Sequence, residues 1–338
     1  KYFIDTKKKK LLIPSFAKTI KKIKEIYIAA CGTSYHASLI GKYWLEKYAN
    51  IKTEVDIASE FRYRNIINIK NSLGIFLSQS GETADTLAVL RYFNQQKGKT
   101  LGIINSAESS IARESNHVME THAGPEIGVA STKAFTTQLV ALGTLTLFMA
   151  NFNKAIGRNE MNKLSNALLE APGQISKILK MDNIFHKTAT SIKNAKNVLY
   201  IGRGTNYPVA LEGALKLKEI SYLHAEAYPA GELKHGPLAL IDSEIPIVAL
   251  AADDYLLDKM LSNLSEVATR GGHLYILTSL DLDIPSEQVK VFNLPDLPDM
   301  LRAIVYTIPL QLLAYHVAVL KGADVDQPRN LAKSVTVE

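Results

Sequence analysis

Short apolar runs alternate along the chain with longer segments in which apolar residues recur at helical spacing. In the first half, this pattern predicts, in chain order, a strand at 26–31, a helix at 34–49, strands at 53–57 and 73–78, a helix at 83–97 and a strand at 100–104. Helices that alternate with buried apolar strands are typical of a parallel sheet covered by helices on both faces. The predicted fold class is therefore α/β.

The same pattern occurs twice. The segment 26–35 resembles the segment 198–207, and each is an apolar strand that runs into Gly-Thr-x-Tyr and then into a helical pattern. Gly32 precedes Glu60 by as many positions as Gly204 precedes Glu232. The offset between the copies stays nearly constant along the chain, which indicates duplication of a whole domain and not a solenoid.

The repeat predicts five parts of the chain. The last part shows no periodicity, which is typical of a frayed tail, and an ordered tail would need a reason. The parts are a basic lead-in at 1–25, a first domain at 26–158, a helical connection at 159–195, a second domain at 196–323 and a tail at 324–338.

Composition and charge narrow the protein class. The 338 residues are 47% hydrophobic and 21% charged, as in ordinary globular proteins. The single cysteine, Cys31, excludes a disulfide framework and a cysteine-based zinc cluster. The N-terminus lacks the apolar region of a signal peptide, and Val140–Ala150 is shorter than the roughly 20 residues that span a bilayer. We therefore expect a cytoplasmic protein that does not enter membranes.

The net charge of +6 comes mostly from one end, since nine lysines lie between Lys1 and Glu25. A lysine run can bind nucleic acid or a membrane surface. No aromatic residue interrupts the run Lys7–Lys10 as a base-stacking platform would, so a solvated lead-in is favoured. No nucleic-acid partner is expected.

A hydroxyl-rich turn follows the strand at 73–78. Ser78-Gln-Ser-Gly-Glu-Thr83 offers hydroxyls, an amide and a glycine directly before a helix, which suits one phosphate group at the carboxyl edge of a sheet. Neither a Walker loop nor a GxGxxG motif is present, so a nucleotide triphosphate or a dinucleotide is not indicated. Capping of the helix by Ser80 or Thr83 is the alternative interpretation.

Two further turns of this kind, Gly32-Thr33-Ser34 and Gly128–Lys133, also open helices in the first half. The second half lacks a hydroxyl-rich turn at the position that corresponds to Ser78–Thr83. The position equivalent to Ser78 is placed at 250, where Leu250-Ala-Ala-Asp-Asp254 has no hydroxyl and ends in two acids. One phosphate site per chain is expected.

Acid–base candidates lie in the second half. Glu212, Lys216 and Glu219 occupy one face of a predicted helix, where an ion-paired solvent face is the alternative interpretation. His235 lies in a loop bounded by glycine and proline, and Lys333 is an isolated lysine of the tail. No cluster of metal ligands is evident.

Several of these segments together resemble the isomerase half of the glutamine–fructose-6-phosphate aminotransferases, also called glucosamine-6-phosphate synthases, which consists of two sugar-isomerase (SIS) domains. The resemblance extends from about Ile26 to the last residue. It is carried by Cys31–Ser34, Ser78–Thr83, Glu126–Lys133, Leu211–Glu219, Gly231–Pro237 and Asp324–Glu338.

The resemblance implies the chemistry. Lys333 would form an imine with open-chain fructose-6-phosphate, and Glu219 would move a proton between C1 and C2, with Lys216 nearby. His235 would assist ring opening from the neighbouring subunit of a homodimer. Neither a metal nor an organic cofactor would be needed. The phosphate would be held by Thr33, Ser34, Ser78, Gln79, Ser80 and Thr83, and the sugar contacted by Val129 and Ser131.

In that family, ammonia comes from a glutaminase domain that begins with a catalytic cysteine, whereas this sequence begins with Lys1. The chain is therefore expected to isomerise fructose-6-phosphate toward glucose-6-phosphate, or to aminate it with free ammonia to glucosamine-6-phosphate, the first step of hexosamine synthesis. Glutamine-dependent synthesis is not expected. The alternatives are another two-SIS isomerase or deglycase, and a non-catalytic SIS regulator that senses a sugar phosphate.

Overall fold

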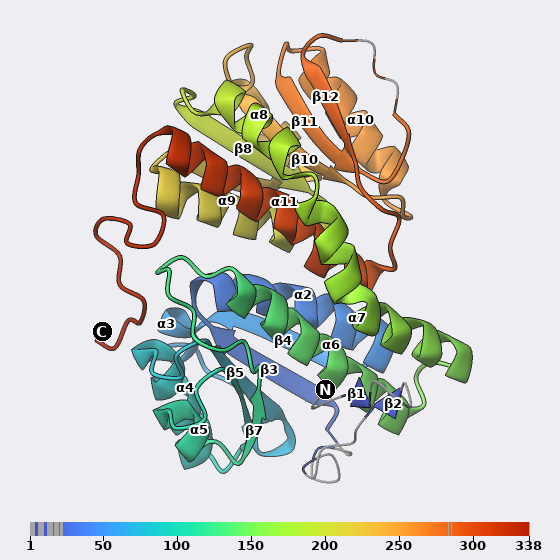
Figure 1. The fold of residues 1–338 in the computed structure, drawn as a ribbon. Coiled ribbons are helices and arrows are strands. Elements are labelled where there is room, and N and C mark those ends of the chain that lie inside the picture. Colours follow the sequence, from blue (N-terminus) through green and yellow to red (C-terminus); the bar gives the residue numbers. More distant parts are fainter. Residues whose placement is uncertain are drawn as a thin grey trace. The chain divides into compact units, whose positions relative to one another are not determined.

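The computed structural model describes residues 4–5, 10–11, 16, 20, 23–282, 284 and 286–337. The chain forms two compact units (Figure 1). Unit 1 comprises Lys1–Ile127, Ser131–Glu170 and Ala332–Glu338, and unit 2 comprises Gly128–Ala130 and Ala171–Leu331. The end of the tail thus belongs to the first unit.

Unit 1 is built on a parallel sheet with the strand order β4-β3-β5-β6-β7. Alternate side chains of its central strands enter opposite faces, so that Tyr27 and Phe76 meet Phe61 and Phe93 on one of them. Helices α3, α4 and α5 cover this face, and α2 and α6 pack together on the other (Figure 1). The strands are β3 (Glu25–Ala30), β4 (Lys52–Ile57), β5 (Leu73–Ser78), β6 (Lys99–Ile104) and β7 (His117–Glu120), and the helices are α2 (Gly32–Ala49), α3 (Ala58–Phe61), α4 (Ala84–Gln95), α5 (Ser110–Glu114) and α6 (Lys133–Asn153).

Four smaller or bridging elements complete the described part of this region. Strands β1 (Ile4–Asp5) and β2 (Lys10–Leu11) form an antiparallel pair. A 3-10 turn, η1 (Ile69–Asn71), precedes β5, and α7 (Arg158–Leu179) runs from unit 1 into unit 2.

Unit 2 repeats the plan with the strand order β12-β11-β10-β8-β9, again all parallel. Helices α8, α9 and α11 lie on one face of this sheet and α10 lies on the other (Figure 1). The strands are β8 (Asn197–Gly202), β9 (His224–Pro229), β10 (Pro246–Ala251), β11 (His273–Thr278) and β12 (Val289–Asn293), and the helices are α8 (Asp182–Ile192), α9 (Asn206–Ser221), η2 (Ala230–His235), η3 (Pro237–Leu240), α10 (Leu257–Ala268) and α11 (Asp299–Leu320).

The α/β fold with two duplicated, helix-covered parallel sheets is thus confirmed. The strand predicted at 73–78 has these bounds, whereas the helix predicted at 83–97 ends at Gln95 because Lys97 adopts a left-handed conformation with φ of 58°. The helix predicted at 34–49 begins earlier, at Gly32.

The offset between the copies grows slightly along the chain. The starts of β3 and β8 give the offset at the first strand of each copy. The offset between the starts of β5 and β10 is one position larger, and the offset between the starts of β6 and β11 is two positions larger. The structural equivalent of Ser78 is therefore Ala251, and its placement at 250 was wrong by one position. Ala251 also lacks a hydroxyl, so the inference drawn from that position is unchanged.

Helices α6 and α11 are long and apolar enough to cross a membrane by length and composition, which corrects the estimate made from Val140–Ala150 alone. In α6 78% and in α11 72% of the relevant window is buried inside the protein. A core helix passes the same test, so this is weak evidence for a membrane span.

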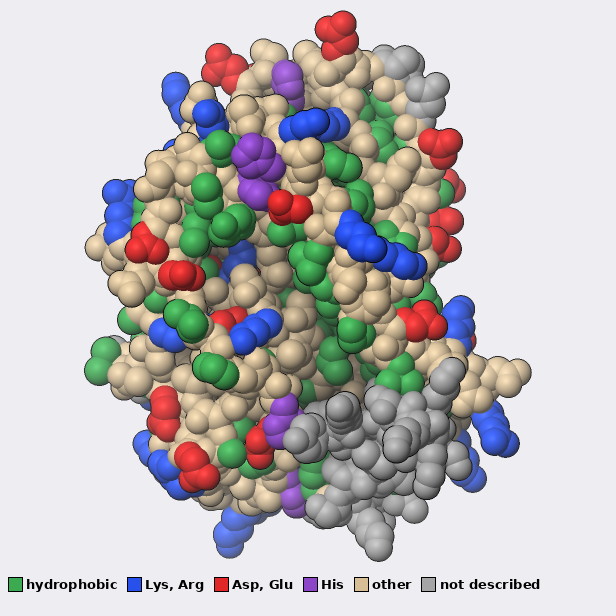
Figure 2. Space-filling model, viewed as in Figure 1, with side chains coloured by type: hydrophobic (Ala, Val, Ile, Leu, Met, Phe, Trp, Pro, Cys, Tyr) green, Lys and Arg blue, Asp and Glu red, His purple; other side chains and the backbone are tan. Residues whose placement is uncertain are grey.

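Charged side chains of both signs are interspersed on the face shown in Figure 2. The side chains of the lysine run Lys7–Lys10 lie outside the described residues.

Candidate active site

The hydroxyl-rich turn between β5 and α4 is built from hydrogen bonds among its own residues. The Ser78 hydroxyl lies 2.9 Å from the Thr83 hydroxyl and accepts the Gly81 N–H at 2.9 Å, and Ser80 Oγ accepts the Glu82 N–H at 3.1 Å. Gly81 has a φ of 70°, and a Cβ there would lie 2.0 Å from Ser109 Oγ, so the turn requires glycine. Thr83 is the N-cap residue of α4, as the capping interpretation expects, but its side chain makes no capping hydrogen bond.

The turn at the start of α2 lies next to it, because β3 pairs directly with β5 and parallel strands end at one edge. Ser34 is buried there, and its hydroxyl accepts a hydrogen bond of 2.9 Å from Gln138 Nε2. Thr33 and Gln79 are half-buried at the same edge. Four hydroxyl-bearing predicted residues are thus joined by hydrogen bonds within their turns or from α6.

Gln138 was missed by the sequence analysis. Its side chain is buried in α6, and its Oε1 has no hydrogen-bond partner among the described residues. An amide on the apolar stripe of a predicted helix is the signal that could have identified it.

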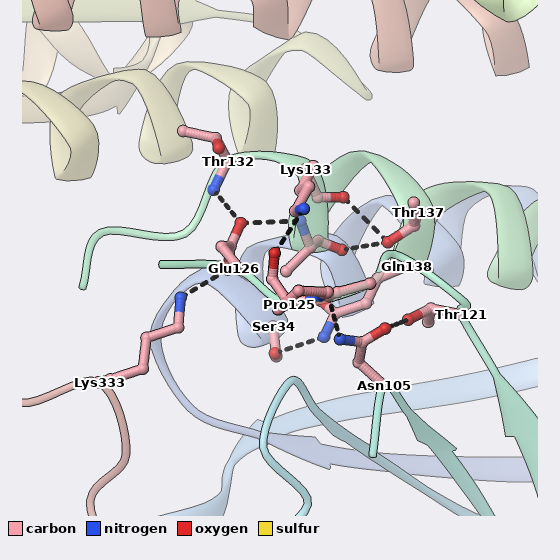
Figure 3. A network of polar contacts seen from close by, with 12 residues as sticks. Ser34, Asn105, Thr121, Pro125, Glu126, Thr132, Lys133, Thr137, Gln138 and Lys333 are labelled. Atoms are coloured by element: carbon pink, nitrogen blue, oxygen red, sulfur yellow. Dashed lines mark hydrogen bonds and ion pairs between the residues drawn. The ribbon is translucent and has the colours of Figure 1, made fainter. Parts of the chain in front are cut away.

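The tail is anchored along the hydroxyl-rich turn Ser78–Thr83, the predicted phosphate turn, so its interpretation as a frayed end is wrong. Ser334 Oγ lies 2.9 Å from Ser80 Oγ, and the Ala84 N–H at the start of α4 donates to the Val335 carbonyl at 3.0 Å. Lys333 Nζ lies 2.6 Å from Oε2 of Glu126 (Figure 3). The structure therefore brings Lys333 together with Ser80 and its neighbours in unit 1.

Glu126 is a second residue that the sequence analysis did not single out. Its side chain is only 5% exposed, and Oε1 accepts the N–H groups of Thr132 and Ala134. Burial alone would raise the pKa of Glu126, but the hydrogen bonds from Lys333, Thr132 and Ala134 outweigh it and lower the pKa. Glu126 is thus a stable carboxylate.

In unit 2, the three acid–base candidates of α9 form one buried cluster, and not an ion-paired solvent face. Glu212 and Lys216 are fully buried, whereas Glu219 is 21% exposed. Lys216 Nζ lies 3.4 Å from Glu212 Oε1 and 2.5 Å from Glu219 Oε2. Burial alone would lower the pKa of Lys216, but the two carboxylates outweigh it and raise the pKa. Lys216 is therefore an ammonium that is paired with both carboxylates and holds Glu219 in place.

We expect Lys216→Met to lower the free energy of unfolding by about 3–5 kcal/mol at pH 7, because it leaves the Glu212 carboxylate buried without a counter-charge. Urea denaturation followed by circular dichroism measures this change. Lys218→Met, on the exposed face of the same helix, should change it by about 0.5 kcal/mol or less. Equal effects of the two substitutions would contradict a buried ion cluster.

The remaining predicted residues lie at separate places. His235 is exposed at the end of η2 in unit 2. Val129 belongs to the short segment of unit 2 that meets the tail, and its N–H donates to the Asp326 carbonyl at 2.9 Å. Ser131 is half-buried just before α6 in unit 1.

At the equivalent edge of the second sheet, a buried arginine pairs with an acidic residue of the loop. Arg302 of α11 is buried and lies 3.0 Å from Asp254, in the loop that corresponds to the phosphate turn. It also donates to the Leu297 carbonyl. Asp254 is thus neutralised by an internal cation. Within the described part of the chain, no group of three or more His, Cys, Asp or Glu side chains is arranged to hold a metal ion.

Comparison with known proteins gives one consistent result. Both halves match the SIS domain family, at residues 19–148 and 191–321. The glutamine–fructose-6-phosphate aminotransferase (isomerizing) of Legionella pneumophila is 53% identical over 317 residues, which are 94% of this chain and 52% of that protein. For the Bartonella henselae enzyme the identity is 49% over 334 residues, 96% and 54% of the two chains. The chain thus spans about half the length of the curated relatives it matches.

A solved structure agrees over a matching length. The C-terminal domain of glucosamine-fructose-6-phosphate aminotransferase from Francisella tularensis has 46% identity and a TM-score of 0.92, and the alignment covers 95% of this chain and 91% of that chain.

Proposed function

Because this chain belongs to the SIS domain family, among the C-terminal domains of glucosamine–fructose-6-phosphate aminotransferases, we propose that it converts fructose-6-phosphate and ammonia to glucosamine-6-phosphate. The observation that carries the proposal is the tail lysine at the phosphate turn. Ser334 bonds to Ser80, so its neighbour Lys333 is kept beside the hydroxyls that would hold the sugar phosphate.

Unit 1 supplies the binding and the covalent step. The amine of Lys333 attacks C2 of the open-chain ketose, a C–N bond forms and the carbonyl oxygen leaves as water. Ammonia then adds to C2 of the protonated imine and Lys333 leaves as a free amine, so that C2 carries an iminium of the incoming nitrogen. This iminium stabilises the charge that develops when a proton leaves C1. The residues that bind the sugar phosphate are Thr33, Ser34, Ser78, Gln79, Ser80, Ser131 and Thr83, with Val129 as a backbone contact to the sugar.

Unit 2 supplies the proton transfer. Glu219 takes the proton from C1 and returns it to C2, and its partial exposure leaves the carboxylate accessible to a substrate. Lys216 holds that carboxylate, while the fully buried Glu212 balances the charge of Lys216. His235 opens the sugar ring.

The wider proposal concerns partners and place. Exposure of His235 supports its donation to the sugar site of a neighbouring subunit in a homodimer. The names of the relatives include glutamine, and we propose that a glutaminase domain supplies the ammonia as a partner of this chain. We place this reaction in the cytoplasm, at the start of hexosamine synthesis.

The test is to incubate the 338-residue chain with fructose-6-phosphate and ammonium chloride and to detect products by mass spectrometry. Glucosamine-6-phosphate is expected, whereas fructose, which lacks the phosphate, should not react. Ser80→Ala should raise KM about tenfold, since a hydrogen bond to a charged group contributes roughly 1.5–3 kcal/mol. Ser176→Ala, at an exposed position of α7, is the matched control and should leave KM unchanged.

Two outcomes would contradict the proposal. Formation of glucose-6-phosphate without any glucosamine-6-phosphate would identify an aldose–ketose isomerase. Binding of fructose-6-phosphate without turnover would identify a sensor.

A further inference from the structure

Lys333 carries the only charged side chain among the described residues 332–337 of the tail. Its ammonium contacts a carboxylate of unit 1 (Figure 3). Lys333 Nζ and Glu126 Oε2 are 2.6 Å apart, and the two side chains are 25% and 5% exposed. These residues are 207 positions apart in the sequence. The contact is therefore a tertiary anchor, and it holds the side chain to which the proposed function assigns the covalent step.

The Glu126 carboxylate is itself held in place, because its other oxygen accepts two backbone hydrogen bonds. Glu126 Oε1 accepts the Thr132 N–H at 2.9 Å and the Ala134 N–H at 3.1 Å, where α6 begins. Negative charge is favourable at a helix N-terminus, so this position also keeps the carboxylate ionised. Glu126 thus presents Oε2 to the tail from a rigid support.

The loop that carries Glu126 is fixed as well. Asn105, directly after β6, accepts the Ala123 N–H at 2.8 Å and donates to the Gly124 carbonyl at 2.9 Å. Lys133 Nζ donates to the Pro125 carbonyl at 2.6 Å (Figure 3). Both backbone neighbours of Glu126 on its N-terminal side are therefore held in position.

A lysine on a carboxylate is an ammonium, and an ammonium has no lone pair with which to attack a carbonyl. We propose that Glu126 is the positioning residue of Lys333: it holds the lysine as an ammonium at the phosphate turn until the open-chain sugar binds, and the lysine leaves it to form the imine. The inference rests on the imine role proposed above. The step is balanced, because an ammonium and a ketone give a protonated imine and one water, with both hydrogens of the water coming from the ammonium.

The charged groups at this place are few. Lys133 donates to the Pro125 carbonyl from the start of α6, and Glu120 with His122 precede the loop at the end of β7. Replacing Glu126 by glutamine should therefore release Lys333 from its carboxylate partner and leave these neighbours in place.

The experiment is borohydride trapping of the imine between fructose-6-phosphate and Lys333, measured by mass spectrometry as a function of pH. In Glu126→Gln the trapping rate at saturating fructose-6-phosphate should fall about tenfold at every pH, because the lysine is no longer held in place. The half-saturating sugar concentration should stay within about threefold of the native value, because the hydroxyls of the turn are unchanged. Glu120→Gln, which removes a carboxylate from the same unit, is the matched control and should keep the native profile.

The outcomes separate the two proposals. No adduct at Lys333 in the native chain would overturn the proposed imine role, whereas an adduct that forms at equal rates in the native chain and Glu126→Gln would overturn the role of Glu126.

A second measurement needs no variant. In the sugar-free native chain, Lys333 should react with acetic anhydride more slowly than the exposed Lys70 at every pH near neutrality. Equal reactivity of the two lysines would overturn the proposal even if Glu126→Gln did not fold.

Discussion

Replacing Lys333 with arginine is expected to lower glucosamine-6-phosphate formation by more than about 10³-fold, a loss comparable with removal of a covalent nucleophile in other enzymes. Arginine keeps the positive charge that pairs with Glu126, but its guanidinium does not form an imine with a ketone. Borohydride trapping followed by peptide mass spectrometry should therefore find no sugar adduct on the tail.

Binding of the sugar phosphate should survive this substitution. The hydroxyls of Ser78, Ser80 and Thr83 are unchanged, so the Kd for fructose-6-phosphate measured by calorimetry should stay within about threefold of the native value. Lys70→Arg, an exposed lysine of the same unit, is the control for activity. An Lys333→Arg chain that aminates fructose-6-phosphate at the native rate would rule out imine chemistry at this residue.

Glu219→Gln should separate the covalent step from proton transfer. Loss of a positioned general base typically costs about 10²–10⁴-fold in rate, so exchange of the C1 hydrogen of the sugar with solvent deuterium should slow by this factor. The imine at Lys333 should still be trapped, because the amide changes nothing in unit 1. Proton NMR in deuterium oxide follows the exchange directly.

Glu244→Gln is the control, because Glu244 is an exposed carboxylate of the same unit. A Glu219→Gln chain that exchanges the C1 hydrogen as fast as the native chain does would show that another group moves the proton.

Much of the fold could be predicted because it is local in sequence. The strands of a parallel sheet are buried on both faces and appear as apolar runs, and Leu73–Ser78 and Leu101–Ile104 stand out between polar turns. The hydroxyl-rich turn could be predicted for the same reason, since the hydrogen bonds that Ser78 makes to Gly81 and Thr83 join residues at most five positions apart.

The contacts that complete the site are not local. Glu126 meets Lys333 across 207 positions, and Gln138 meets Ser34 across 104. No periodicity links such residues, because the fold alone decides which of them become neighbours. Burial of Lys216 could not be predicted from the sequence either. The same Glu–Lys–Glu spacing occurs on exposed helices and on helices that, like α9, are enclosed by another helix and a sheet.

If the proposed phosphate binds at the N-terminus of α4, the backbone N–H of Ala84 links its affinity to the position of the tail. This donor lies at the N-terminus of α4 and is engaged by the Val335 carbonyl. A phosphate that takes the same donor must displace that carbonyl, at a cost of about 1 kcal/mol. By thermodynamic reciprocity, the phosphate then weakens tail docking by the same amount. Removal of the tail should therefore strengthen phosphate binding while it ends catalysis, and the form of the protein that binds most tightly is not the form that reacts.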